Sequence, residues 1–359
     1  MLRRNDSKAL LERAFGPSAA GNTTRFVAIA GQDGLRWIIP ARLGASSRVL
    51  SDWHPWNTKS RLAWRAIRFS SYTGVLSFLP GTRAFEFGLS DVAWHEFGWT
   101  QTYPPHVVTY VGTVGPHQKL VCSFVDPHSC ETSMVVKFPL AETAKEQLRR
   151  DFTSLGELID EGRDVGPKPL RIDSQARFAA QSYLQGRPED VAITDAHLVF
   201  LAALARGGKK IRLDAVRNEL RAQRNVMVTN GLLNGAHLDW IDGFLNAGDW
   251  SGTVPSVRTH GDFAPWNLKR SASGDIRAVD WEDSAPDDLP YLDLHHFRSS
   301  VKRALGITYS VPWDAYTAAL KRLDPEFSAA AAATAIAATR FVYWARRRAG
   351  GHPEEWDTP

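Results

Sequence analysis

Short apolar stretches separated by turn-forming residues fill the first hundred positions of the 359-residue chain. Residues 24–30 and 35–40 are rich in β-branched and aromatic side chains. The Gly-Gln-Asp-Gly sequence of residues 31–34 separates them, so the pattern predicts two strands joined by a turn. Between residues 61 and 79 apolar positions recur at helical spacing, which predicts a helix with arginines on another side. Residues 1–104 are therefore expected to form a mixed α/β region.

The pattern changes to clearer strands after position 104. Residues 107–113, 120–125 and 133–138 are apolar runs bounded by turn-forming residues, which predicts three consecutive strands. Leucines at helical spacing then predict a helix over residues 141–162. A strand pair containing residues 176–184 is expected after residue 169, so this part of the chain is predicted to form an antiparallel sheet with one helix.

Helical spacing dominates the rest of the chain, up to residue 253 and again after residue 290. A strand-rich part followed by a helix-rich part is the element order of an α+β fold. The most apolar segment, residues 327–344, consists largely of alanine and carries Arg340. We therefore interpret it as a buried helix and expect no transmembrane segment.

The composition and the cysteine count indicate the class of protein and its cellular compartment. The apolar fraction of 43% and charged fraction of 23% are ordinary for a soluble globular enzyme. Only two cysteines occur, Cys122 and Cys130, so a secreted domain built on disulfides is excluded. The N-terminal residues lack the apolar run of a signal peptide, and a cytoplasmic protein is expected.

The charge is unevenly distributed along the chain. Residues 1–100 carry 13 Lys and Arg against 7 Asp and Glu, a net charge of +6, whereas the whole chain is at +4. Such an excess fits either a solvated basic face or a surface for an anionic partner. No nucleic-acid partner is expected.

The strongest chemical signal is the sequence Thr-His-Gly-Asp-Phe-Ala-Pro-Trp-Asn of residues 259–267. Transfer of a γ-phosphoryl group needs a carboxylate that orients the attacking hydroxyl and accepts its proton, and oxygen ligands for Mg²⁺. Asp262 suits the first task, and Asn267 is close enough to share its loop. Asp280 follows the apolar residues 276–279 and can supply a second metal ligand.

The order His-Gly-Asp-x-x-x-x-Asn, apolar strand, Asp resembles the aminoglycoside phosphotransferase and choline kinase family, relatives of the protein kinases. The resemblance covers about residues 107–344. It implies a small-molecule phosphotransferase that uses ATP and Mg²⁺, with Asp262 as catalytic base and Asn267 and Asp280 as metal ligands. It also implies that His260 is a structural brace of the loop.

The same resemblance implies a bilobal, protein-kinase-like fold. Residues 105–184 would form a small N-lobe with an antiparallel sheet, and residues 185–359 a mostly helical C-lobe. Residues 1–104 lie outside the resemblance and are expected to pack on the N-lobe as an extra α/β region. Asp293 lies where the family often has a loop-supporting aspartate.

The nucleotide-binding half of the site is expected around Lys137 in the third of these strands, where the family places a lysine against the α- and β-phosphates. A lysine in an apolar strand is costly unless its ammonium group is paired. The family pairs it with a glutamate of the next helix, but here Asp151 has the matching leucines four and seven positions later, and Glu146 is the alternative partner. Because Asp is one methylene shorter than Glu, we expect a long or water-bridged pair.

Other nucleotide contacts follow from the resemblance. Gly112 and Gly115 flank the loop that the family lays over the phosphates, where glycine permits a close approach of backbone N–H groups. Lys119, just after this loop, could reach a phosphate. Ser182 and Tyr183 belong to the segment at the family's interlobe hinge, whose backbone would hold adenine.

The sequence does not determine which compound accepts the phosphoryl group. A polycationic aminoglycoside would need an acidic pocket, and acidic residues do follow the metal loop: Glu282, Asp283, Asp287 and Asp288. The many arginines and lysines of the C-terminal helices would repel such a substrate. We therefore expect a small-molecule hydroxyl acceptor, most simply a sugar or sugar-like metabolite, with an aminoglycoside or amino alcohol as the alternative. A catalytically silent nucleotide-binding module is the alternative from another class.

Overall fold

The computed structural model describes residues 4–21, 23–31, 34–56, 58–233 and 235–349. The chain divides into two compact units. The first unit comprises the residues up to 189 together with 269–273 and 277–282, and the second comprises residues 190–268, 274–276 and those from 283 onward.

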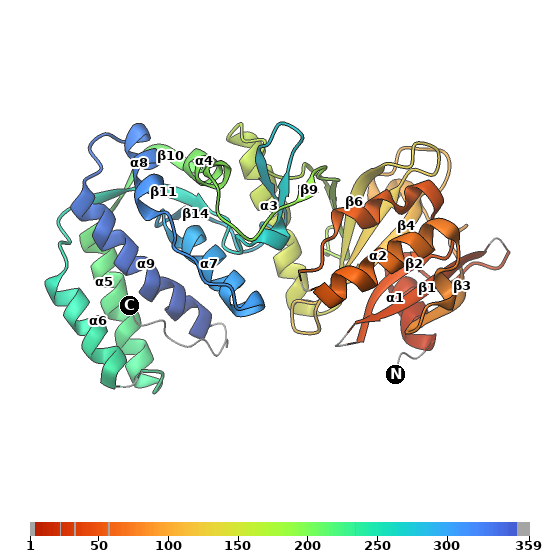
Figure 1. The fold of residues 1–359 in the computed structure, drawn as a ribbon, viewed down its shortest axis with the longest axis horizontal. Coiled ribbons are helices and arrows are strands. Elements are labelled where there is room, and N and C mark those ends of the chain that lie inside the picture. Colours follow the sequence, from red (N-terminus) through yellow and green to blue (C-terminus); the bar gives the residue numbers. More distant parts are fainter. Residues whose placement is uncertain (1–3, 22, 32–33, 57, 234, 350–359) are drawn as a thin grey trace. The chain divides into compact units, whose positions relative to one another are not determined.

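An antiparallel sheet of eight strands forms the centre of the first unit (Figure 1). Its spatial order is β3-β1-β2-β4-β5-β6-β8-β7. The strands are β1 (Thr23–Gly31), β2 (Gly34–Pro40), β3 (Thr82–Gly88), β4 (His106–Val111), β5 (Lys119–Val125), β6 (Thr132–Pro139), β7 (Pro169–Ile172) and β8 (Ala179–Ser182). The strands predicted from the sequence are confirmed, with the strand pair that contains residues 176–184 present as β7 and β8, while β3 was not recognised in the sequence.

The first hundred residues supply three strands of this sheet. β2 pairs with β4, with Trp37 opposite Tyr110 and Ile38 opposite Thr109. β1 pairs with β2 on one side and with β3 on the other. Residues 1–104 thus continue the sheet of residues 105–184 edge to edge, and the two parts share one compact unit.

Both faces of the sheet are covered in its N-terminal half. Successive side chains of a strand point to opposite faces, so Phe26 and Val27 enter different cores. The core of Phe26 contains Leu11 of α1 (Arg4–Phe15), a helix that the sequence did not predict. The core of Val27 contains Leu50 of the 3₁₀ helix η1 (Gly44–Asp52) and Trp64 of α2 (Thr58–Thr73). The helix α2 confirms the helical pattern that starts near residue 61.

The helix α3 (Glu142–Asp160) crosses β6, β7 and β8 and confirms the helix predicted over residues 141–162. Its buried stripe contains Leu148, Leu155 and Leu158, and Asp151 lies in the same stripe. The spacing that buries the leucines therefore also turns a carboxylate toward the sheet.

The second unit combines helices with a three-stranded antiparallel sheet in the order β10-β11-β14. Its helices are α4 (Asp195–Ala203), α5 (Leu213–Thr229), α6 (Gly235–Ala247), α7 (Leu292–Leu305), α8 (Trp313–Leu323) and α9 (Ala329–Ala349). Its strands are β10 (Ala205–Arg212), β11 (Thr253–Thr259) and β14 (Ala285–Asp288). A further small sheet has the order β13-β12-β9, from β9 (Arg187–Pro188), β12 (Leu268–Arg270) and β13 (Ile276–Ala278), and most of its residues belong to the first unit.

The expectation of uninterrupted helix up to residue 253 is wrong at β10. Gly207 and Gly208 interrupt the helical pattern, and Gly208 has a φ of +74°, a conformation that L side chains rarely adopt. The strand pairs with β11, a contact distant in sequence. The alanine-rich segment forms α9, and none of the helices in the described ranges is long and apolar enough to cross a bilayer.

Candidate active site

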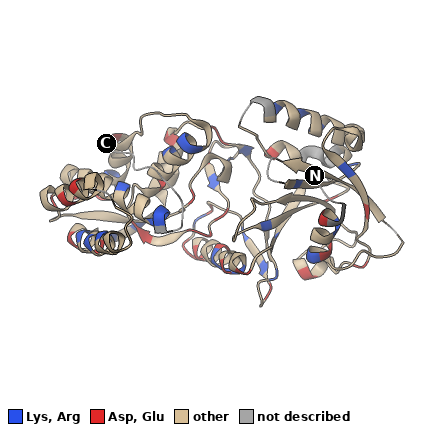
Figure 2. Ribbon diagram, turned by 90° about the horizontal axis from the view of Figure 1, so that it is seen from below, with Lys and Arg blue, Asp and Glu red and all other residues tan. Residues whose placement is uncertain are grey.

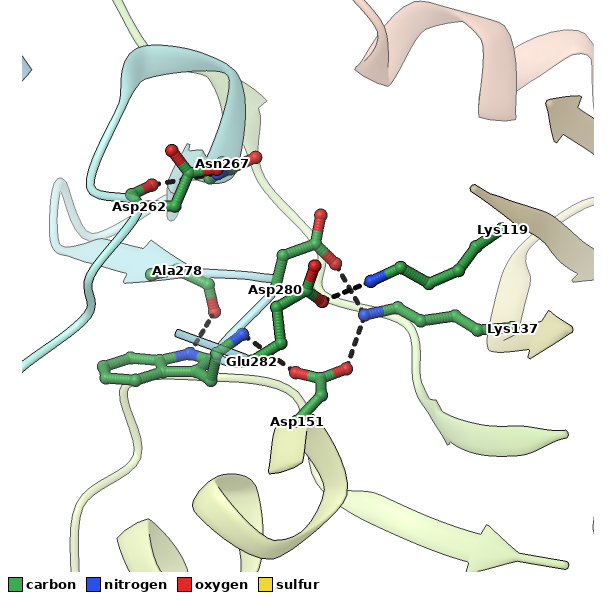
Figure 3. Close-up of polar contacts among 9 residues, drawn as sticks. Lys119, Lys137, Asp151, Asp262, Asn267, Ala278, Asp280 and Glu282 are labelled. Carbon is green, nitrogen blue, oxygen red and sulfur yellow. Dashed lines mark hydrogen bonds and ion pairs between the residues drawn. The ribbon is translucent and has the colours of Figure 1, made fainter. Parts of the chain in front are cut away.

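A buried lysine bonded to two carboxylates forms the first part of the site (Figure 3). Lys137 Nζ lies 2.6 Å from Asp151 Oδ2 and 2.6 Å from Asp280 Oδ1. The side chains of Lys137 and Asp151 are each 3% exposed, whereas that of Asp280 is 41% exposed. The geometry therefore anchors the ammonium group on the buried side and leaves the Asp280 carboxylate near solvent.

Asp151 is the partner of Lys137, and the contact is direct. The expectation of a long or water-bridged pair is wrong, because the strand and the helix approach closely enough for the shorter side chain. Glu146 lies on the exposed side of α3, where it pairs with Arg150. The second oxygen of Asp151 accepts a 2.8 Å hydrogen bond from the backbone N–H of Trp281, so both of its carboxylate oxygens are engaged.

The lysine is held in its charged form. Burial alone would lower the pKa of Lys137, but the negative charges of Asp151, Asp280 and Glu282 outweigh burial and raise the pKa. A permanently charged ammonium group at the end of a strand is suited to binding an anion such as phosphate.

A second ion pair lies beside the first. Lys119 Nζ is 2.5 Å from Glu282 Oε2, so the lysine predicted to reach a phosphate is directed to this carboxylate instead (Figure 3). Carboxylate oxygens of Asp151, Asp280 and Glu282 lie within 4.8 Å of one another. Because Asp151 is engaged by the lysine and by a backbone N–H, Asp280 and Glu282 are the members of this cluster that could hold a hard cation. Asp280 also has a φ of +62°, which is uncommon for a residue other than glycine.

The protonation of Glu282 gives a testable pH dependence. Burial, and then the neighbouring Asp280, raise the pKa of Glu282 from 4.5 to about 7. The native state thus holds this proton more tightly than the unfolded state, and stability falls as pH rises through this interval. Between pH 4.5 and about pH 7 we expect the thermal midpoint of Glu282→Gln to fall less than that of wild type, measured with a chelator present. Thermal midpoints that fall equally with pH in wild type and variant would contradict this assignment.

The two glycines of the expected phosphate loop lie in the β4–β5 hairpin and differ in their surroundings. A Cβ atom on Gly112 would lie 3.0 Å from the backbone oxygen of Lys119, so close packing of the hairpin favours glycine there. A Cβ atom on Gly115 would have no neighbour within 4 Å.

A residue that the sequence did not single out also contacts this loop. Arg36 Nη1 of β2 lies 3.4 Å from both the backbone oxygen of Val111 and Thr113 Oγ1.

The segment expected to hold adenine uses its backbone N–H groups internally. The N–H of Ser182 donates to the backbone oxygen of Lys168 at 2.8 Å, and that of Tyr183 donates to the backbone oxygen of Ser133 at 3.0 Å. Adenine binding through these two donors is therefore not supported. The sequence could not reveal this, because both acceptors lie on other strands or loops.

The second unit contains the loop with Asp262 and Asn267, which is braced around its carboxylate. Asp262 Oδ1 is 2.8 Å from His296 Nε2. Asn267 Nδ2 donates to Asp262 Oδ2 at 2.7 Å and to the Asp262 backbone oxygen at 2.9 Å (Figure 3). Burial acts to raise the pKa of Asp262, but the bond to His296, the histidine charges and the bond to Asn267 outweigh it and lower the pKa. Asp262 is thus an ionised carboxylate with a side chain that is 41% exposed.

The backbone of this loop is fixed by Asp293. Its buried carboxylate accepts hydrogen bonds from the N–H groups of His260 at 2.7 Å and Gly261 at 3.0 Å. His260 Nδ1 accepts a bond from the Asp262 N–H at 3.3 Å. Gly261 has a φ of +84°, and a Cβ atom there would collide with the backbone oxygen of Asp283. Each of these contacts limits where the Asp262 side chain can lie.

His296 is the functional candidate that the sequence interpretation missed. It lies on α7, three residues after Asp293, and residues at this spacing share one face of a helix. That spacing was the available signal, because a helix that presents Asp293 to the loop also presents His296. The imidazole is 7% exposed, so its contact with Asp262 is shielded from bulk water.

The acidic residues that could have received a polycation are largely paired. Asp287 Oδ2 lies 2.5 Å from Lys209 Nζ, and Asp288 is held by Arg346 at 2.6 and 3.1 Å. Glu282 of the first unit is paired with Lys119. These carboxylates therefore do not form a pocket of uncompensated negative charge.

No family model and no curated protein sequence matches the chain. Among solved structures, the chain is similar to a macrolide 2′-phosphotransferase type I, at 14% identity and a TM-score of 0.49 over 69% of this chain and 88% of that one. It is also similar to macrolide 2′-phosphotransferase MphH from Brachybacterium faecium, at 18% identity and a TM-score of 0.47 over 68% and 88%. A choline kinase from Streptococcus pneumoniae has 16% identity and a TM-score of 0.36 over 69% and 84%. These neighbours are small-molecule phosphotransferases and a kinase. The roles of individual residues are argued from the contacts within this chain.

Proposed function

We propose that the protein is an ATP-dependent phosphotransferase that moves the γ-phosphoryl group to a hydroxyl group of a small molecule. The observation that carries this proposal is the ionised Asp262, which His296 and Asn267 hold in a braced loop. Phosphoryl transfer depends mainly on positioning and electrostatics, and such a carboxylate can orient the attacking hydroxyl.

The proposed reaction assigns one role to each charged group. The acceptor oxygen forms a bond to the γ-phosphorus while the bond from that phosphorus to the bridging β-oxygen breaks, and ADP leaves. The hydroxyl proton passes to the carboxylate of Asp262. Lys137, oriented by Asp151, binds phosphate oxygens of the nucleotide.

Asn267 and Asp280 are the proposed ligands of Mg²⁺. Asn267 directs its Nδ2 atom to Asp262, which leaves the amide oxygen as the group that can accept a cation. Asp280 offers a partly exposed carboxylate, and both ligands have the oxygen chemistry that Mg²⁺ prefers. The ion would offset negative charge on the β- and γ-phosphates.

The acceptor is proposed to be a neutral hydroxyl compound such as a sugar. This follows from the pairing of Glu282, Asp287 and Asp288 with basic residues, which leaves little uncompensated charge for a polycation. We expect pooled neutral sugars to stimulate ATP turnover more than aminoglycosides or choline do, measured as ADP formation. Stimulation by the cationic compounds alone would favour the aminoglycoside or amino-alcohol alternative and contradict the sugar proposal.

A catalytically silent nucleotide-binding module is the second candidate. It would share the nucleotide site around Lys137 with the first candidate, so the internal use of the Ser182 and Tyr183 N–H groups does not distinguish the two. Such a module would bind nucleotide through Lys137 but would not catalyse phosphoryl transfer, so a change at Asp262 would alter no rate. The two candidates therefore differ in whether a change at Asp262 has a catalytic effect.

A further inference from the structure

The outward face of α2 exposes large apolar side chains. Leu62, Phe69 and Tyr72 are 61%, 68% and 64% exposed, and with Arg65 they follow the spacing of one helical face. The opposite face of the same helix carries Trp64, which is only 5% exposed and belongs to the core. The helix thus has a second apolar face that is not needed for packing against the sheet.

Two further exposed apolar residues follow in the next element, and basic residues lie among and beside the exposed apolar ones. Val75 and Phe78, at the 3₁₀ helix η2 (Leu76–Phe78), are 44% and 82% exposed. Throughout residues 53–85 there is no Asp or Glu, and Figure 2 shows α2 at the upper right with blue but no red segments. We call this face the α2 surface; its members are Leu62, Phe69, Tyr72, Val75 and Phe78 with Arg61, Arg65 and Arg68.

The arginines of the α2 surface are exposed and have no acidic partner within the described part of the chain. Arg61 donates to the backbone oxygen of Pro55 at 3.2 Å, which leaves its charge uncompensated. The surface belongs to the part of the sequence with a net charge of +6 over residues 1–100. Its charge is therefore complementary to an anionic partner.

We propose that the α2 surface docks on an anionic phospholipid membrane. A helix with an apolar face and basic flanks binds in the plane of a membrane interface, because the apolar side chains enter the boundary between headgroups and acyl chains. The arginines then lie at the level of the lipid phosphates, where basic residues are attracted to anionic headgroups. This inference does not depend on the phosphotransferase proposal.

The charge and the side-chain types favour lipid over two other occupants. A symmetric contact with a second copy of the chain would place these arginines against one another with no acidic residue to separate them. Single-stranded nucleic acid is bound by stacking of bases on aromatic rings. Leu62 and Val75 cannot stack in this way, although they can enter an acyl-chain boundary.

The test is cosedimentation of the full chain with vesicles of phosphatidylcholine, alone or with about 30% phosphatidylglycerol. We expect binding to the anionic vesicles and little binding to the neutral ones. The triple variant Arg61→Gln/Arg65→Gln/Arg68→Gln should weaken partitioning by about 100-fold, since one basic residue contributes about fivefold. Phe69→Ser/Phe78→Ser should weaken it by at least about tenfold through lost apolar burial.

Matched controls lie elsewhere in the same unit. Arg149→Gln/Arg150→Gln changes exposed arginines of α3, and Leu170→Ser changes an apolar residue that is 49% exposed. Both controls should bind vesicles like wild type, and all variants should keep the wild-type thermal midpoint. The proposal is overturned if wild type fails to bind anionic vesicles, binds neutral ones equally well, or if the α2 variants lose only self-association or oligonucleotide binding.

Discussion

Asp262→Asn is expected to lower the maximal rate of phosphoryl transfer by about 10³-fold, the usual contribution of a general base. The asparagine has the shape of the aspartate and can still contact His296 and Asn267, so the loop should keep its conformation. What it cannot do is accept a proton from the acceptor hydroxyl. ATP affinity, measured by titration calorimetry, should stay within about twofold because the carboxylate is not assigned to the nucleotide.

The matched control for this variant is Asp239→Asn. Asp239 is an exposed carboxylate of α6 in the same unit, so its substitution removes the same charge away from the loop. Its rate should equal that of wild type. If Asp262→Asn retained the wild-type rate, Asp262 would not be the base. If it lost ATP affinity and rate together, the carboxylate would have a structural or binding role instead.

Lys137→Met is expected to destabilise the first unit by about 3 kcal/mol and to weaken ATP binding strongly. The substitution leaves Asp151 buried with no cation, retaining the hydrogen bond from the Trp281 N–H. An uncompensated buried carboxylate is costly because it has left water without a partner. The thermal midpoint should fall by roughly 6–12 °C, measured by scanning calorimetry.

A double variant separates the structural effect from the functional one. In Lys137→Met/Asp151→Asn the buried site carries no charge, and the amide oxygen can still accept the Trp281 N–H. The double variant should recover most of the decrease in thermal midpoint, while its ATP binding stays weak. Glu146→Gln is the control on the exposed side of the same helix and should leave both properties unchanged. A double variant as unstable as the single one would show that pairing does not account for the loss.

Local pattern was sufficient to predict the elements that carry the first part of the site. The strands β4 to β6 and the helix α3 have apolar positions at the periods of their structures, so their existence could be read from the chain. A carboxylate partner for Lys137 was predictable because a buried ammonium group needs one, and the resemblance to the phosphotransferase family implied that this partner lies on α3. The length of that contact was not, since it depends on how closely the helix packs on the sheet.

Features set by distant contacts were not predicted. β10 lies in a segment that we expected to be helical; Gly207 and Gly208 interrupt the helical pattern there, and the pairing with β11 makes the segment a strand. The pairing of β2 with β4 joins residues about seventy positions apart, which no local pattern specifies. The contact of His296 with Asp262 and the bonds of the Ser182 and Tyr183 N–H groups were not predicted either, because their partners are distant in sequence.

Transfer of label from γ-labelled ATP to a small molecule is the most direct test of the central proposal. The reaction would contain the full chain, Mg²⁺, and a pool of sugars, amino alcohols and aminoglycosides, with Asp262→Asn in parallel. We predict a labelled acceptor that requires Mg²⁺ and does not form with Asp262→Asn. Tight ATP binding by wild type, with no labelled product from any pooled compound and no difference from Asp262→Asn, would contradict the phosphotransferase assignment and favour the silent module.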